Sequence, residues 1–272
     1  MDRIRRMAND LSPDEERALR PEVPANLANV RAVLVETKEP GNIGASARAL
    51  NGMGITDLWV VNPQCDWQDS SEARKFAMNS LDVLRNAREA ASLDEVLEDV
   101  HFLVGTTHRR RVRRLGQPVE AREAARRIAE ISQKNRVAIL FGREDFGLSN
   151  EALSRCNLIA SIPMARRNPS LNLAQAVQII AYEVFLASLG DVEAPPYKLA
   201  TRRDVEALVH RVERLLHAVE FRPMNDDWEA IRTPLRRVVG RVPLERRDLE
   251  VLMKVCRDIE NFIERKIPKP SD

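Results

Sequence analysis

Short apolar runs alternate with helical patterns over the first two thirds of the chain. The runs are rich in β-branched residues and predict buried strands; they span 31–37, 58–61, 101–106, 136–142 and 158–163. Helical patterns follow at 43–54, 70–78, 92–99, 118–132 and 149–156, and a longer one ends the series at 171–189. Strands that alternate with helices predict an α/β fold whose parallel sheet is covered on both faces.

The pattern changes near residue 190. Two adjacent prolines within 191–201 are incompatible with a helix and predict a linker. From residue 202 to residue 272 apolar residues recur every three or four positions, which predicts a small all-helical extension of three helices. Residues 1–29 are charged without a regular apolar pattern and are expected to form a flexible leader. The α/β domain is therefore expected over residues 30–190.

Cysteine usage and hydropathy narrow the class of protein. The three cysteines are Cys65, Cys156 and Cys256, with no Cys-x-x-Cys pair and no ligand spacing to the four histidines. A disulfide framework and a metal site are therefore not expected. No stretch approaches the ~20 apolar residues of a membrane span, and the N-terminus has no apolar signal core. These features predict a cytoplasmic protein with reduced thiols.

The net charge of +2 says little, but arginines gather in two places. The first cluster follows the strand at 101–106, and the second is an adjacent pair near residue 166. Either cluster could be solvated surface charge or could contact the phosphates of a nucleic acid. The candidates are Arg109, Arg110, Arg111, Arg113, Arg114, Arg166 and Arg167.

Ligands of parallel sheets bind beyond the carboxyl ends of the strands. The loops expected there are 36–44, 106–114, 142–149 and 163–172. Gly142 directly follows a strand, where a missing Cβ permits close approach by a ligand. Arg143 and Glu144 form either an ion-paired turn or part of a site. The chain has no G-x-G-x-x-G segment and no P-loop, which argues against NAD, FAD and ATP.

The helix pattern at 43–54 carries a further candidate. Asn42 is expected to cap this helix at its N-terminus. Arg48 lies away from the apolar face formed by Ile43, Ala47 and Leu50. It is either an ordinary surface arginine or a cation that binds an anion at the ligand edge.

Three segments of the chain resemble, in order and spacing, the motifs of the SpoU/TrmH family. They are EPGNIGASARALNGMG at 39–54, LFGREDFGLSNEAL at 140–153 and NPSLNLAQAVQIIAYEV at 168–184. Members of this family are S-adenosylmethionine-dependent RNA ribose 2′-O-methyltransferases of the SPOUT class. The resemblance implies a trefoil knot built from about residue 137 to residue 189. It also implies a homodimer whose active site draws on both subunits.

The resemblance also implies roles for individual residues. Residues that match the family's cofactor-binding segments are Thr106, Thr107, Gly142, Ile162, Pro169, Ser170 and Leu171. Residues that match the polar groups around the transfer site are Asn42, Glu144, Ser170 and Asn172, and Arg48 matches the catalytic arginine. No metal is implied, because a sulfonium methyl donor is reactive without one.

The helical extension narrows the expected substrate. The segments FRPMND at 221–226 and LRRVVGRVPLERRDLEVLMKV at 235–255 resemble the C-terminal extension of a tRNA-modifying subfamily. That subfamily methylates the ribose of nucleotide 32 in the anticodon loop. Two alternatives remain: a ribosomal RNA 2′-O-methyltransferase of the same fold, and a catalytically silent RNA-binding protein. The joint presence of Arg48, Glu144, Ser170 and Asn172 argues against the silent alternative.

Overall fold

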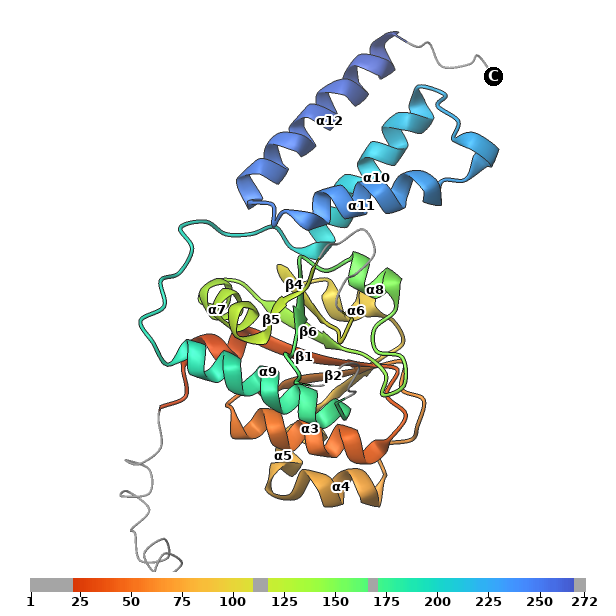
Figure 1. The fold of residues 1–272 in the computed structure, drawn as a ribbon. Helices are drawn as coiled ribbons and strands as arrows, with labels where there is room; N and C mark the ends of the chain where they lie inside the picture. Colours follow the sequence, from red (N-terminus) through yellow and green to blue (C-terminus); the bar gives the residue numbers. More distant parts are fainter. Residues whose placement is uncertain (1–21, 110–116, 166–170, 267–272) are drawn as a thin grey trace, which may run out of the picture.

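A seven-stranded parallel sheet forms the centre of the protein (Figure 1). The computed structural model describes residues 22–109, 117–165 and 171–266. The sheet order is β3-β2-β1-β6-β4-β7-β5, and every neighbouring pair is parallel. The strands are β1 (Val30–Val35), β2 (Asp57–Val61), β3 (Arg88–Ala90), β4 (Phe102–Thr106), β5 (Val119–Glu120), β6 (Val137–Phe141) and β7 (Leu158–Ser161). The predicted α/β class with a parallel sheet is confirmed.

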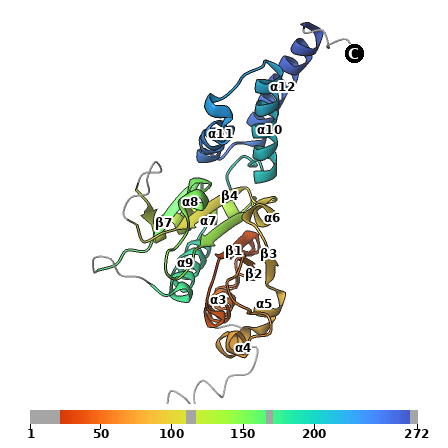
Figure 2. The ribbon, with the colours of Figure 1, turned by 90° about the vertical axis from the view of Figure 1, so that its right-hand side faces the viewer.

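Helices connect the strands and cover the sheet (Figures 1 and 2). In the α/β domain they are α3 (Pro40–Gly52), α4 (Ser71–Ala77), α5 (Leu81–Asn86), α6 (Leu93–Leu97), α7 (Ala121–Ser132), α8 (Asn150–Ser154) and α9 (Leu173–Ser188). Short 3-10 helices are η1 (Ala25–Asn29), η2 (Met78–Ser80) and η3 (Met224–Asp226). The C-terminal helices are α10 (Arg202–Ala218), α11 (Glu229–Arg241) and α12 (Arg246–Lys266).

Strand β6 shows why the sheet is buried on both faces. All five of its side chains are buried, and successive side chains of a strand point to opposite faces. Val137, Ile139 and Phe141 join the core cluster that includes α3, α7 and α9. Ala138 and Leu140 join the second cluster, under α6 and α8. A continuous apolar run without polar alternation is therefore the pattern that two covered faces require.

The folded domain begins before Val30. Leu27, in η1, is fully buried, and Asn26 donates hydrogen bonds to the hydroxyls of Ser132 (2.8 Å) and Ser188 (3.0 Å). These contacts anchor the segment to α7 and α9. The predicted leader boundary at residue 29 is therefore wrong for residues 25–29, because one apolar residue in a short turn gives no periodic signal. Residues 1–21 lie outside the described ranges.

Two edge strands differ from the sequence-based expectation. Residues 119–120, expected to open a helix, form strand β5 beside β7, and α7 begins at Ala121. Residues 88–90 pair with β2 as β3. Both strands are too short to show an alternating pattern, and only the neighbouring strand selects their conformation.

The three C-terminal helices form a helical module with its own small core. Buried Ala200, Val205, Leu208, Leu249 and Cys256 hold it together. Near the sheet, Arg202 donates hydrogen bonds of 2.7 Å to the Arg155 carbonyl and to Asn157 Oδ1, and burial lowers its pKa to about 10. The predicted three-helix extension is thus present and is fixed to the α/β domain. No helix in the described ranges is long and apolar enough to cross a membrane.

Truncating Leu27 tests the packing of η1. Leu27→Ala is expected to lower the free energy of unfolding by about 2–5 kcal/mol, because it leaves a cavity in the core. Val23→Ala, in the same segment at a side chain that is 56% exposed, is the matched control and should change stability by less than about 0.5 kcal/mol. Urea-induced unfolding measures both. Equal effects of the two variants would contradict the packing of η1.

Candidate functional site

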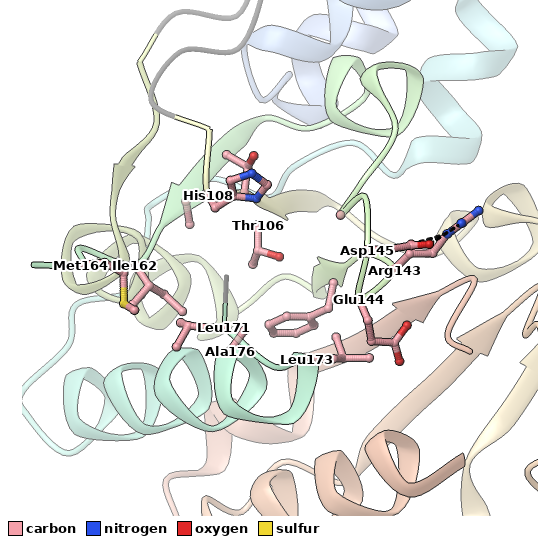
Figure 3. Close-up of a pocket in the computed structure, with 15 residues that line it drawn as sticks. Thr106, His108, Arg143, Glu144, Asp145, Ile162, Met164, Leu171, Leu173 and Ala176 are labelled. Carbon is pink, nitrogen blue, oxygen red and sulfur yellow. Dashed lines mark hydrogen bonds and ion pairs between the residues drawn. The ribbon is translucent and has the colours of Figure 1, made fainter. Parts of the chain in front are cut away.

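A pocket opens at the carboxyl ends of β4, β6 and β7 (Figure 3). One wall is apolar and comes from Phe141, Ile162, Leu171, Leu173 and Ala176. The opposite side carries polar and charged residues from the loops after β4 and β6. Those residues are Thr106, Thr107, His108, Arg143, Glu144 and Asp145. An apolar wall facing a few polar groups is the usual form of a small-molecule site.

Two threonines fix the loop after β4. The Thr106 hydroxyl donates to the Leu140 carbonyl at 2.8 Å, so the ends of β4 and β6 stay together. The Thr107 backbone N–H donates to the Ala160 carbonyl at 2.9 Å, which ties the same loop to β7. The pocket floor is therefore made of backbone whose geometry the sheet determines.

Gly142 has a structural requirement of its own. A Cβ at this position would lie 2.1 Å from the Gly147 carbonyl carbon and 2.1 Å from the Leu148 nitrogen. The loop folds back on itself here, and the Gly147 N–H donates to the Arg143 carbonyl at 2.8 Å. The close approach that the sequence predicted is therefore an approach by the protein's own backbone, at the edge of the pocket.

A chain of hydrogen bonds joins the three motif segments. Asn42 Nδ2 donates to Glu144 Oε1 at 2.8 Å, and Asn172 Nδ2 donates to Asn42 Oδ1 at 2.8 Å. The other Glu144 oxygen accepts from the Lys38 backbone N–H at 3.2 Å. An ionised carboxylate only accepts hydrogen bonds, so Glu144 fixes the orientation of the Asn42 amide, which in turn orients Asn172. Figure 3 shows Glu144 directed out of the pocket toward α3.

The expected capping role of Asn42 is wrong. Helix α3 begins at Pro40, with Glu39 as its N-cap residue, so Asn42 lies inside the first turn. Proline at the first helical position is favoured because its missing N–H has no helical partner to lose. The earlier start turns the Asn42 side chain toward Glu144. Asn172, in contrast, caps α9 through the Ala174 N–H at 2.9 Å and forms a capping box with Gln175.

Arg48 does not line this pocket. It is six residues after Asn42 on α3, which is about 9 Å along the helix axis and on a different side of it. Its guanidinium is exposed and contacts the sulfur of Met78, the first residue of η2, at 2.8 Å. The structure thus brings Asn42, Glu144 and Asn172 together but does not place Arg48 with them.

The rim beside Glu144 is a network of charges. Arg143 donates two hydrogen bonds of 2.9 Å to Asp145, and Lys38 pairs with the same carboxylate at 2.5 Å. Hydrogen bonds from Arg143 and then from Lys38 hold the pKa of Asp145 well below its usual range. Figure 3 shows Arg143 and Asp145 directed away from the cavity. The sequence left two interpretations of Arg143, and the structure shows the ion-paired one.

Five of the seven predicted cofactor-binding residues line this one pocket: Thr106, Thr107, Gly142, Ile162 and Leu171. The other two, Pro169 and Ser170, lie outside the described residues. So do most of the predicted RNA-binding arginines: Arg110, Arg111, Arg113, Arg114, Arg166 and Arg167. Arg109 is described, and its guanidinium donates to Asn150 Oδ1 at 2.6 Å.

Sequence reasoning missed several residues of the apolar wall. Phe141, Met164, Leu173 and Ala176 line the pocket without having been assigned to it. Phe141, Leu173 and Ala176 lie in apolar runs that predicted a strand and a helix, and that signal does not separate a core position from a pocket wall. Met164 lies in the loop 163–172, which was expected at the ligand edge without a role for this residue. His108, which received no role from the sequence, lies exposed at the polar side.

The cysteines and acidic residues show no sign of metal or thiol chemistry in the part of the chain that the structure describes. No three His, Cys, Asp or Glu side chains gather there as metal ligands would. Burial raises the pKa of Cys156 to about 12, and burial together with nearby Glu144 raises that of Cys65 to about 11. Both are therefore protonated and weakly nucleophilic near neutral pH.

Comparison with known proteins identifies the family. The model of the SpoU rRNA Methylase family matches residues 29–182. The chain belongs to this family. The predicted family and the predicted enzyme class, an RNA methyltransferase, are thereby confirmed.

Two curated relatives align with this SpoU family member over almost the whole of their own length. The tRNA (cytidine/uridine-2′-O-)-methyltransferase TrmJ of Pectobacterium atrosepticum is 37% identical over 243 residues, which cover 86% of this chain and 98% of the relative. TrmJ of Escherichia coli K12 is also 37% identical over 243 residues, with 86% and 96% covered.

Solved structures share the fold. TrmJ from Z. mobilis ZM4 superposes with a TM-score of 0.73 at 28% identity, covering 85% of this chain and 98% of that one. A methylase family protein from Neisseria gonorrhoeae gives a TM-score of 0.64 at 32% identity, covering 71% and 98%. Both comparisons support the SpoU-type architecture of the sheet.

Adding a methyl group to Gly142 tests the pocket edge. Gly142→Ala is expected to lower the free energy of unfolding by about 1–3 kcal/mol, because the new Cβ displaces the backbone of Gly147 and Leu148. Gly52→Ala is the matched control: a Cβ there meets nothing within 4 Å, and stability should be unchanged or slightly higher. Chemical denaturation measures the free energy of unfolding of both variants. A fully stable Gly142→Ala protein would contradict the loop geometry.

Proposed function

We propose that this SpoU family member is an S-adenosylmethionine-dependent tRNA ribose 2′-O-methyltransferase that acts on cytidine or uridine at nucleotide 32 of the anticodon loop. The observation that carries the proposal is the convergence of Thr106, Thr107, Gly142, Ile162 and Leu171 on one pocket, beside the Glu144–Asn42–Asn172 chain. The tRNA substrate is supported by TrmJ relatives that are covered to 96–98% of their length.

The residues of the pocket fit S-adenosylmethionine. Adenine is a flat apolar ring with polar edges, and the pocket pairs an apolar wall with backbone polar groups at three strand ends. The wall residues Ile162, Leu171 and Ala176 would hold the ring, and the backbone around Thr107 and Gly142 would bind its polar edges. The bound cofactor supplies a methyl group on a positively charged sulfur. A knotted crossing of residues 137–189 is part of the proposal; it is supported by β6 and β7 lying on opposite sides of β4.

The protein has to position a ribose hydroxyl beside the methyl group and allow its proton to leave. Alignment of the hydroxyl oxygen with the methyl group can lower the barrier by about 7–11 kcal/mol. Glu144 accepts two hydrogen bonds within the protein, so its role is to orient Asn42 and Asn172. The hydroxyl proton passes to a phosphate oxygen of the RNA, or through the Ser170 hydroxyl to solvent water, as the methyl group leaves the sulfur and its bond to the ribose oxygen forms. Asn42 does not relay the proton, because its amide donates to Glu144 and accepts from Asn172.

Arg48 serves as an electrophilic anchor. A guanidinium stays protonated in proteins, which excludes it as a general base. It instead binds the phosphate beside the target ribose and stabilises negative charge on the attacking oxygen. Because Arg48 lies outside the pocket of its own protomer, we assign it to the pocket of a second copy. The exposed apolar residues Tyr182 and Leu186 of α9, and Leu189 at its C-cap, support such a homodimer.

Mass spectrometry of nucleosides tests the activity. Purified protein and S-adenosylmethionine are incubated with unmodified tRNA and, separately, with ribosomal RNA. A 2′-O-methyl group at nucleotide 32 of tRNA is the expected product. Methylation of ribosomal RNA alone would favour the ribosomal alternative that the family description names, and no product on either RNA would contradict the enzyme assignment.

Removing the Arg48 guanidinium is expected to lower kcat by about 10²–10³-fold, the usual effect of losing one donor to a developing oxyanion. The affinity for S-adenosylmethionine should be unchanged, because the proposed partner of Arg48 is a phosphate of the RNA and Arg48 is not among the residues that line the cofactor pocket. Methyl transfer kinetics and calorimetric titration measure the two properties of Arg48→Ala. Arg126→Ala, an exposed arginine on α7, is the control and should keep full activity.

Mixed dimers test the assignment of Arg48 to the second subunit. Arg48→Ala and Glu144→Ala protomers, each inactive alone, are co-expressed with different affinity tags. Shared sites predict that the mixed dimer regains activity at one of its two pockets, since one pocket then has both groups intact. Activity that stays at the level of the single variants would place Arg48 and Glu144 in the same protomer's site.

A further inference from the structure

Phe146 is an exposed aromatic ring at the mouth of the pocket. It lies in the loop between β6 and α8, and its side chain is 68% exposed. The residues on either side of it, Asp145 and Gly147, both line the pocket, whereas Phe146 does not. The ring therefore lies on the loop that borders the pocket, with most of its surface exposed to solvent.

The loop holds this ring in place. The Arg143 guanidinium carbon lies 5.2 Å from the ring centroid, within the range of a cation–π contact. Asp145 fixes that guanidinium through two hydrogen bonds of 2.9 Å, and Glu36 pairs with it at 3.6 Å. Gly147, with φ +67°, closes the turn back to Arg143. An aromatic ring that is already immobilised loses little conformational entropy on binding.

A single exposed apolar residue is ordinary in proteins. Phe146 differs from an ordinary exposed residue in one respect. The ion-paired Arg143 guanidinium lies over its ring, while most of the ring is exposed to solvent. Nearby cations suit a polyanion: Lys38 is 43% exposed in its ion pair, and Arg109 is bonded to Asn150 where this same loop enters α8. An aromatic platform beside arginine and lysine is the usual arrangement for unpaired RNA bases.

We infer that Phe146 stacks against a base of the single-stranded RNA next to the methylated nucleotide. The inference rests on the proposed function, because it places the substrate of that reaction on the rim of the same pocket. Stacking tolerates any base, so Phe146 sets the position of the RNA strand and not its sequence. Its contribution is to binding and alignment, while the ribose hydroxyl is handled by the residues within the site.

Four proteins are compared with an unmodified tRNA transcript: wild type, Phe146→Ala, Phe146→Leu and Phe146→Trp. Loss of one stacked base is expected to lower kcat/KM by about 5–100-fold in the Ala and Leu variants, mainly through a higher KM. The Trp variant should stay within about twofold of wild type. Leucine keeps most of the apolar area without an aromatic face, so it separates stacking from simple apolar burial.

Two further measurements exclude indirect effects. Affinity for S-adenosylmethionine and melting temperature should be equal in all four proteins, because the ring neither lines the pocket nor fills the core. Sedimentation should give the same mass for all four. A shift of Phe146→Ala to a smaller mass would assign the ring to a contact between protein copies and overturn the inference. A Leu variant as active as wild type would overturn it as well.

Failure of the proposed function is distinguishable from failure of this inference. If wild type transfers no methyl group to tRNA, the proposed function fails. Dissociation constants of the four proteins for the tRNA transcript still test the ring: those of wild type and Phe146→Trp should be lower than those of Phe146→Leu and Phe146→Ala. If wild type is active and all four proteins bind and methylate tRNA equally, the inference alone is overturned.

Discussion

The Asn42 carboxamide connects parts of the chain that are far apart in sequence. It donates to Glu144, 102 residues away, and accepts from Asn172, 130 residues away. Each partner belongs to a different strand–loop–helix unit, so no local propensity brings them together. The parallel sheet does so, because the carboxyl ends of β1 and β6 lie side by side in it. The geometry of the site thus depends on sheet register and on one amide whose two polar ends are both occupied.

Sequence patterns predict the parts of the fold that are long and strongly apolar. Strand β6 and helix α9 follow from uninterrupted apolar runs, and the linker at 191–201 follows from two prolines. The edge strands β3 and β5 and the 3-10 turn η1 do not follow, because two to five residues carry too little periodicity. Their conformations come from neighbours that are distant in sequence, such as Ser132 and Ser188 for Asn26.

For the site, motif resemblance predicts which segments meet, but the sequence does not give the reason for each residue. Motif resemblance selected Gly142, Glu144 and Asn172, and the structure brings these segments to one edge of the sheet. Resemblance did not explain why Gly142 must be glycine, since that reason is a backbone contact with Gly147 inside the loop. Local rules also placed Asn42 incorrectly as a cap, because Pro40 starts the helix earlier. A helix boundary that moves by three residues redirects side chains, and here Asn42 lies in the first turn, from which it donates to Glu144.

The distribution of charges suggests how binding and chemistry are divided. Arg143 and Lys38 share the Asp145 carboxylate on the rim, which holds the loop rigid and leaves one positive charge among these three groups. Arg48, by contrast, has no carboxylate partner among the described residues, and a cation without such a partner keeps its full field for a phosphate. In the mechanism that we propose, Arg48 reaches a pocket only when a second copy of the chain approaches α3. A dimer and the bound RNA would then complete the site together.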